Sequence, residues 1–131
     1  MPAAIRKLQL LVAATWAEQY DTQAPVNSGV IANTAGATLL SVVASNKSST
    51  TLYLMFFDAT ALPNNGSVPV MTPIALKQDT PLNLRLNDGP GGNTLFGLKF
   101  DNGITFAVST TSDTLTVDAS SSVWATVRYQ N

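Results

Sequence analysis

Apolar residues occur along this chain in short runs of strand length, and one run is apolar on both faces. Residues 52–57 (Leu-Tyr-Leu-Met-Phe-Phe) contain no charged or small polar side chain, whereas a strand with one hydrated face would alternate apolar and polar positions. We therefore expect a strand at residues 51–58 whose two faces are both covered. Such a strand requires at least two layers of β-structure.

Further short runs, rich in β-branched and aromatic side chains, are separated by turn-forming residues at fairly even spacing. This spacing is typical of a sandwich or a barrel. The predicted strands are residues 38–45, 51–58, 68–76, 82–86, 96–100, 104–108, 114–117 and 123–129. The expected fold is all-β, an antiparallel β-sandwich of about eight strands with a jelly-roll or immunoglobulin-like topology.

Two of these runs carry more specific expectations. Pro69 and Pro73 remove ladder donors from the run that contains them, which places that run at a sheet edge or at a switch between sheets. Residues 101–103 (Asp-Asn-Gly) join the runs 96–100 and 104–108. They predict a hairpin between these two runs, with the glycine in the left-handed conformation.

The chain is expected to divide near residue 35, into an N-terminal arm of residues 1–35 and a β-sandwich domain of residues 36–131. The arm mixes small and polar residues with short apolar pieces, and its later part is expected to be loop, with room for one or two short strands. Its large apolar side chains must be buried against this protomer or a neighbour, so we expect them to contact a partner. These predicted contact residues are Ile5, Leu8, Leu10, Val12, Trp16 and Tyr20.

The start of the arm also has features of a targeting segment. Arg6 and Lys7 precede an apolar run, as in a secretory signal. Gln9 interrupts that run, however, and the run is too short to span a bilayer. We therefore expect an edge strand or arm here and no membrane partner.

Composition removes several classes of function. The 131 residues include no cysteine and no histidine, so disulfides, thiolate chemistry, a histidine base and the common zinc and haem ligand sets do not apply. Charged residues make up 11% of the chain, against about 25% in an average soluble domain. The formal net charge is −1 and the basic residues are scattered, which argues against a nucleic-acid partner. A surface with so few charges favours association, and we expect a homo-oligomer, a trimer or a dimer.

Carboxylates near the ends of predicted strands are the remaining candidates for chemistry. Asp and Asn at such positions are first of all turn formers; paired carboxylates for glycoside hydrolysis and a calcium site in the loops stay as alternatives. Residues 88–93 (Asp-Gly-Pro-Gly-Gly-Asn) are glycine-rich, but a phosphate cradle needs a helix after it, and a strand is predicted there. The expectation is a protein that is not an enzyme, with no catalytic residue, cofactor or metal.

One aromatic residue is expected to mark a surface. Trp124 lies out of phase with Val123, Ala125 and Val127, which places it on the opposite face of its strand. An exposed Trp124 would mark a contact with a partner, and stacking on a sugar ring is the alternative.

Several of these segments together resemble a known group of proteins. They are residues 52–59, 61–63 and 66–70, the glycine-rich turn at 88–92, and residues 103–116. In this succession the chain resembles small all-β proteins encoded among the structural genes of tailed bacteriophages, over residues 37–129. It departs from the pattern at residues 95–100, where a shorter and more polar connection is expected.

The resemblance implies a function for which no catalytic residue is needed. It implies a virion protein, in particular a capsid decoration or cement protein that binds the major capsid protein on the outer shell, after synthesis in the cytoplasm of the bacterial host. The alternatives are a tail or neck component and a receptor- or glycan-binding module of a tail fibre.

Overall fold

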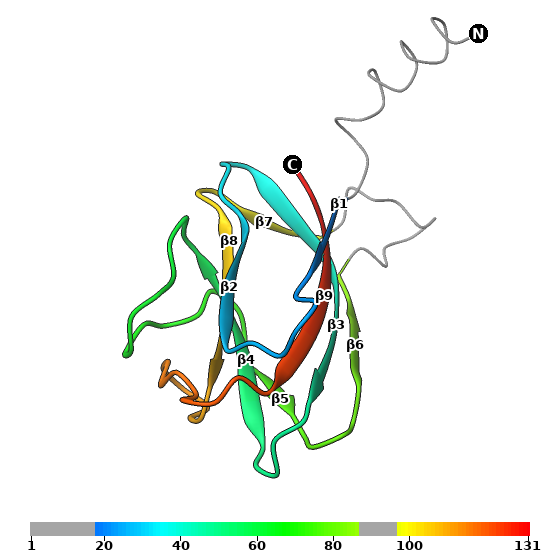
Figure 1. Cartoon of the computed structure of the whole chain (residues 1–131). Coiled ribbons are helices and arrows are strands. Elements are labelled where there is room, and N and C mark those ends of the chain that lie inside the picture. The colour runs from blue at the N-terminus through cyan, green and yellow to red at the C-terminus, as the bar shows by residue number, and fades with distance from the viewer. Residues whose placement is uncertain (1–17, 87–96) are drawn as a thin grey trace, which may run out of the picture.

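The computed structural model describes residues 18–86 and 97–131 and contains no helix in that part of the chain. Two antiparallel sheets pack face to face as a β-sandwich (Figure 1), which confirms the predicted fold class. The strands are β1 (Glu18–Asp21), β2 (Ser28–Ala32), β3 (Ala37–Asn46), β4 (Leu52–Asp58), β5 (Ile74–Leu76), β6 (Leu82–Arg85), β7 (Leu98–Phe100), β8 (Ile104–Ser109) and β9 (Val123–Gln130).

The strand order is that of a jelly roll. One sheet has the order β1-β9-β3-β6, with β7 also paired to β3, and the other has the order β2-β8-β4-β5. The pairs β1–β9, β2–β8, β3–β6 and β4–β5 join the first half of the chain to the second half in reverse order, like one long hairpin. Rolling that hairpin up adds the pairs β3–β9 and β4–β8. This topology decides between the two sandwich types that the sequence left open.

The main core lies between the two sheets. On β9, Val123, Ala125 and Val127 are buried, while Trp124 between them is exposed. This alternation supplies one apolar face to the core, as predicted for the strand. The largest buried side chains that meet in this core include Leu39, Leu54, Phe56, Phe100, Ile104 and Phe106.

Strand β4 is covered on both faces, as its sequence predicts. Its side chains at positions 52, 54 and 56 face the main core. Met55 and Phe57 face outward and form a second, smaller cluster with Ala107 and Leu115. The second cover is thus a loop of the same chain, residues 110–117, rather than a further sheet or another protomer.

The predicted hairpin between residues 96–100 and 104–108 is wrong. Strand β7 pairs with β3 in one sheet, and β8 pairs with β2 and β4 in the other, so residues 101–103 cross between the layers. Gly103 is not among the residues with positive φ. A Cβ at this position would lie 2.7 Å from the carbonyl oxygen of Ala32 and 2.8 Å from that of Ala59. Close approach of backbone, rather than a left-handed turn, therefore requires the glycine.

Three further boundaries differ from the sequence prediction. Residues 18–32 of the predicted arm form two short strands, β1 and β2, and these are edge strands of the two sheets. Residues 114–117 do not form a strand and contribute a single bridge, Val117 to Ser109. Of residues 68–76 only Ile74–Leu76 is a strand, at the sheet edge that the prolines predicted. The local sequence predicts the bounds of such short segments poorly, because whether they form a strand depends on pairing with a partner far away in the chain.

Candidate functional site

The residues predicted to contact a partner fall into two groups. Five of them lie outside the described residues: Ile5, Leu8, Leu10, Val12 and Trp16. The sixth, Tyr20, lies in β1 and packs against the main core. Its ring meets that of Phe106 edge to face, with centroids 6.0 Å apart. Partial burial raises the pKa of the Tyr20 hydroxyl. Tyr20 is therefore partly buried against this protomer's own core, and its contact with a partner stays a prediction.

Gly29 on β2 makes room for this aromatic pair. A side chain at position 29 would meet the Tyr20 hydroxyl and would lie 2.7 Å from Cε1 of Phe106. The two sheets thus approach closely between β1 and β2, at one side of the sandwich.

A shallow recess of about 250 Å³ lies on the outer face of the five-stranded sheet. Trp124 on β9 is 39% exposed and therefore lies on the surface, as predicted. Its neighbour in the recess, Val43 on β3, is 45% exposed. The recess is lined by Asp21, Val43, Ala44, Ser45, Pro81, Trp124, Ala125 and Thr126. An aromatic side chain with hydroxyls and a carboxylate around it can pack against an apolar group or stack on a sugar.

A second exposed apolar surface lies on the connection between β4 and β5, which projects from the side of the four-stranded sheet (Figure 1). Leu62 is 52% exposed, Val68 is 71% exposed and Val70 is 49% exposed. No charged residue occurs from position 59 to position 76. We call these three side chains and the loop that carries them, residues 59–73, the apolar loop.

Backbone hydrogen bonds hold the apolar loop in place. The Gly66 N–H donates to the carbonyl of Leu115 at 2.7 Å, and the Leu115 N–H donates to the carbonyl of Ser67 at 2.9 Å. The Val70 N–H donates to the carbonyl of Phe56 at 3.0 Å, beyond the end of the β4–β5 pairing. The loop therefore has a defined shape before any partner binds, which lowers the entropic cost of binding.

The side chain of Asn65 adds a further link between the apolar loop and the loop of residues 110–117. Its Oδ1 accepts the N–H of Val117 at 2.9 Å. Since Leu115 also covers Met55 and Phe57, the apolar loop and the outer face of β4 form one connected unit.

Asp58, at the end of β4, organises the turn between β7 and β8. Its carboxylate accepts the backbone N–H groups of Asn102 at 2.7 Å, Gly103 at 3.3 Å and Asp101 at 3.3 Å. These hydrogen bonds, above all the one from Asn102, hold the pKa of Asp58 below its ordinary value, against the opposing effect of desolvation. The Asp58 carboxylate therefore has a structural role, which is to hold this turn in place.

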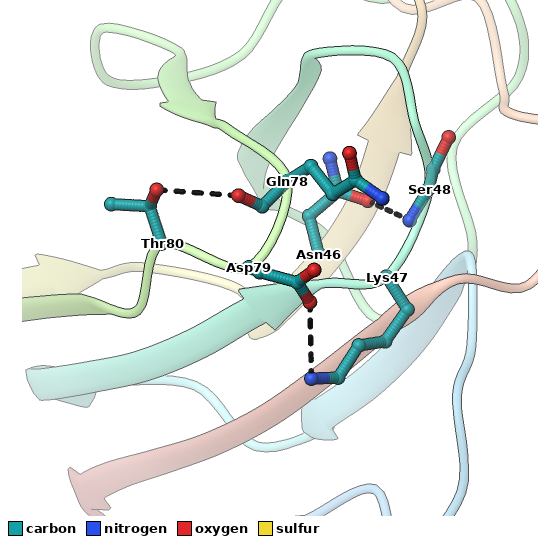
Figure 2. A network of polar contacts seen from close by, with 6 residues as sticks. All are labelled: Asn46, Lys47, Ser48, Gln78, Asp79 and Thr80. Carbon is teal, nitrogen blue, oxygen red and sulfur yellow. Dashed lines mark hydrogen bonds and ion pairs between the residues drawn. The ribbon is translucent and has the colours of Figure 1, made fainter.

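A polar network ties the β3–β4 turn to the β5–β6 turn (Figure 2). Asn46 is fully buried. Its Nδ2 donates to the carbonyls of Thr50 and Leu76, each at 2.8 Å, and its Oδ1 accepts the Ser48 N–H at 2.7 Å. At the surface of the same network, Lys47 and Asp79 form an exposed ion pair at 3.3 Å. This network is structural, since its buried member is fully hydrogen-bonded within the chain.

Residues 18–86 and 97–131 hold no group of three or more Asp, Glu, His or Cys side chains that could bind a metal ion. Within the same residues, no helix has the length and hydrophobicity needed to span a bilayer.

No protein-family model, curated protein or solved structure matches the chain. The candidate functional site is therefore defined by the two exposed apolar surfaces alone. Of these, sequence reasoning identified Trp124 but missed the apolar loop, because residues 68–76 were assigned to a strand. The uncharged stretch from residue 59 to residue 76 is the signal that could have indicated it.

Proposed function

We propose that the protein is a structural, protein-binding component of a tailed-bacteriophage virion, most specifically a capsid decoration protein on the outer shell. In this role it binds the major capsid protein and stabilises contacts between its subunits. The observation that carries the proposal is the apolar loop. It exposes three aliphatic side chains, Leu62, Val68 and Val70, on a stretch of chain without a single charge.

Physical properties of interfaces support this assignment. The core of a protein–protein interface is depleted in charged residues, and the loop has that composition. Its hydrogen bonds to Leu115 and Phe56 preorganise it, which favours binding without a large ordering cost. A decoration protein acts in many copies on one shell, so modest contacts suffice when they are repeated.

One analogy supports the same function with less force, and a second is compatible with it. The sequence resemblance over residues 37–129 is to tailed-bacteriophage structural proteins. The jelly-roll topology occurs in viral capsid domains and also in lectins, so the fold suits both a shell protein and a sugar-binding protein and does not choose between them.

The experiment that tests the proposal measures occupancy on capsids. Phage particles with capsid and tail, assembled without the protein, from the phage that encodes it, are mixed with the purified chain, sedimented and imaged by cryo-EM. We expect binding in hundreds of copies per particle at the outer surface. Tens of copies or fewer at a tail or neck would favour the tail or neck alternative, and an absence of binding would overturn the function.

The apolar loop is tested separately with a triple variant, Leu62→Ser, Val68→Ser and Val70→Ser. We expect its occupancy to fall about tenfold or more, which corresponds to about 1.4 kcal/mol. The comparison variant is Val43→Ser, which removes a similarly exposed valine at the Trp124 recess. It should leave occupancy unchanged, because the recess is not the proposed contact with the shell. Full occupancy by the triple variant would show that another surface meets the shell.

The remaining predicted contact residues, Ile5, Leu8, Leu10, Val12 and Trp16, are tested by deletion of residues 2–16. The deletion stops before Glu18 because β1 begins there. Capsid binding that survives the deletion would leave the apolar loop as the sole proposed contact.

A second candidate function is binding of a host glycan at the Trp124 recess. The observation that favours it is the half-exposed indole beside Asp21, Ser45 and Thr126, which can supply stacking and hydrogen bonds to one sugar ring. In a Trp16→Phe background, Trp124 is the single tryptophan. A shift of its fluorescence on addition of host polysaccharide would support glycan binding, and an unchanged spectrum would eliminate it.

A further inference from the structure

The outer edge of β2 differs from the other sheet edges. Strand β2 lies at the end of the four-stranded sheet, and neither Ser28–Ala32 nor the flanking Asn27 and Asn33 include a charge or a proline. Exposed edges usually carry such residues, because they prevent pairing with another chain. The other edge strands have them: β1 contains Glu18 and Asp21, β5 lies between Pro73 and Lys77, β6 follows Pro81 and contains Arg85, and β7 contains Lys99.

The backbone of β2 presents hydrogen-bonding groups at this edge. The Val108 N–H donates to the carbonyl of Asn27 at 2.8 Å, so Asn27 directs its polar groups toward β8. In an antiparallel ladder this direction alternates from residue to residue. The N–H and C=O groups of Ser28 and Val30 therefore point away from β8, and β8 is the one strand that pairs with β2 in the described part of the chain.

We infer that this edge is a self-association seam, at which the β2 strands of two copies of the chain pair antiparallel across a twofold axis. With the axis at Gly29, Ser28 lies opposite the partner's Val30, and each such pair exchanges both of its N–H···O=C bonds. The two four-stranded sheets become one continuous sheet across the dimer.

A second copy fits this edge for reasons of symmetry and charge. The edge is self-complementary, which an isologous contact requires. A formal net charge of −1 per chain opposes association only weakly. Because the other edges carry charges or prolines, pairing at β2 ends at the dimer instead of continuing into a fibre. The inference selects a dimer over a trimer and does not depend on the proposed function.

The first test compares two lysine variants of the full chain by sedimentation over a range of concentrations. Val30→Lys places a charge at the seam, diagonally across from the same charge on the second copy. Asn83→Lys makes the same change of net charge on β6, whose edge is already charged. We expect wild type and Asn83→Lys to reach a dimer. We expect Val30→Lys to raise the dimer dissociation constant about tenfold or more, with an unchanged circular dichroism spectrum.

A second test does not depend on the folding of the lysine variant. The chain contains no cysteine, so Ser28→Cys and Val30→Cys are clean single-thiol proteins. Under mild oxidation, a mixture of the two should form disulfide-linked dimers faster than either protein alone, because the register places Ser28 opposite the partner's Val30. A wild type that stays monomeric, a trimer, or equal rates in the mixture and the separate proteins would overturn the inference.

Discussion

The carboxylate of Asp58 accepts the backbone N–H of Asn102 at 2.7 Å, across 44 positions of the chain. This contact joins the end of β4, in one sheet, to the turn that carries the chain from β7, in the other sheet, to β8. The same carboxylate also accepts the N–H of Gly103, the residue at which the turn passes closest to the carbonyl oxygens of Ala32 and Ala59. Asp58 therefore acts as a clamp on the crossing between the two layers.

Replacement of this clamp should make stability less dependent on acid pH. The pKa of Asp58 is lower in the folded protein than in the unfolded chain. Its contribution is therefore present above a pH of about 4 and is lost as the pH falls through the folded pKa. We expect Asp58→Ala to lower the free energy of unfolding by about 1 kcal/mol at pH 7, because the carboxylate is near the surface. The difference from wild type should shrink at a pH of about 2, as measured by urea denaturation.

Asp101→Asn is the matched control for this prediction. It removes a carboxylate from the same turn but keeps the backbone N–H that donates to Asp58. The control should retain the acid-dependent loss of stability. An Asp58→Ala protein with the same pH profile as wild type would contradict the clamp.

Buried Asn46 should contribute far more to stability than the ion pair beside it. Asn46→Ala leaves the buried carbonyl of Leu76 and the half-buried N–H of Ser48 without their partner, and a buried unsatisfied group costs roughly 1–3 kcal/mol. We expect a loss of about 3 kcal/mol in the free energy of unfolding, measured by urea denaturation.

Lys47→Ala serves as the comparison for Asn46. It breaks the exposed ion pair with Asp79, and exposed pairs contribute less than about 1 kcal/mol. The small loss that it causes should diminish further in high salt. A larger effect from Lys47→Ala than from Asn46→Ala would show that the network is held together from its surface.

The sequence predicted the strands in which the order of apolar and polar side chains shows which face is buried. The apolar run of β4 indicated a strand covered on both faces, and the phase of Trp124 placed it on the outside of β9. Both predictions depend only on local alternation, which the pleat of a strand converts directly into faces.

The sequence could not predict which strands pair. The turn at residues 101–103 has the composition of a hairpin, yet β7 and β8 enter different sheets, because their partners β3, β2 and β4 lie far away in the chain. Likewise, β1 and β2 look like parts of an arm until β9 and β8, about 70 or more positions later in the sequence, provide their ladders. The apolar loop could not be predicted for the same reason, because its shape depends on hydrogen bonds to Leu115, which is distant in the sequence.

Leu115 should be essential to the outer cover of β4. Leu115→Ala removes most of the side chain that packs on Met55 and Phe57 and should lower the free energy of unfolding by about 2–4 kcal/mol. It should also increase binding of a hydrophobic dye, because two large apolar side chains gain access to water. The control Leu62→Ala, at a residue that is 52% exposed, should change stability by less than about 0.5 kcal/mol. Equal effects of the two variants would mean that residues 110–117 do not cover β4.

Alkaline pH should weaken the fold, because Tyr129 loses its proton beside Glu18 of the edge strand β1. Burial, a hydrogen bond from its hydroxyl to Glu18 and the charge of Glu18 raise the pKa of Tyr129, with burial the largest cause. A group with a raised folded pKa stabilises the fold below its unfolded pKa of about 10, and this contribution is lost as the pH rises through the folded pKa. We expect Glu18→Gln to bring the tyrosine absorbance titration at 295 nm toward lower pH, and Tyr129→Phe to remove that component. Tyr20→Phe is the comparison, since burial alone raises the pKa of Tyr20. In the Tyr20→Phe protein, Glu18→Gln should still shift the titration curve. A curve that no longer responds to Glu18→Gln would contradict the contact between Glu18 and Tyr129.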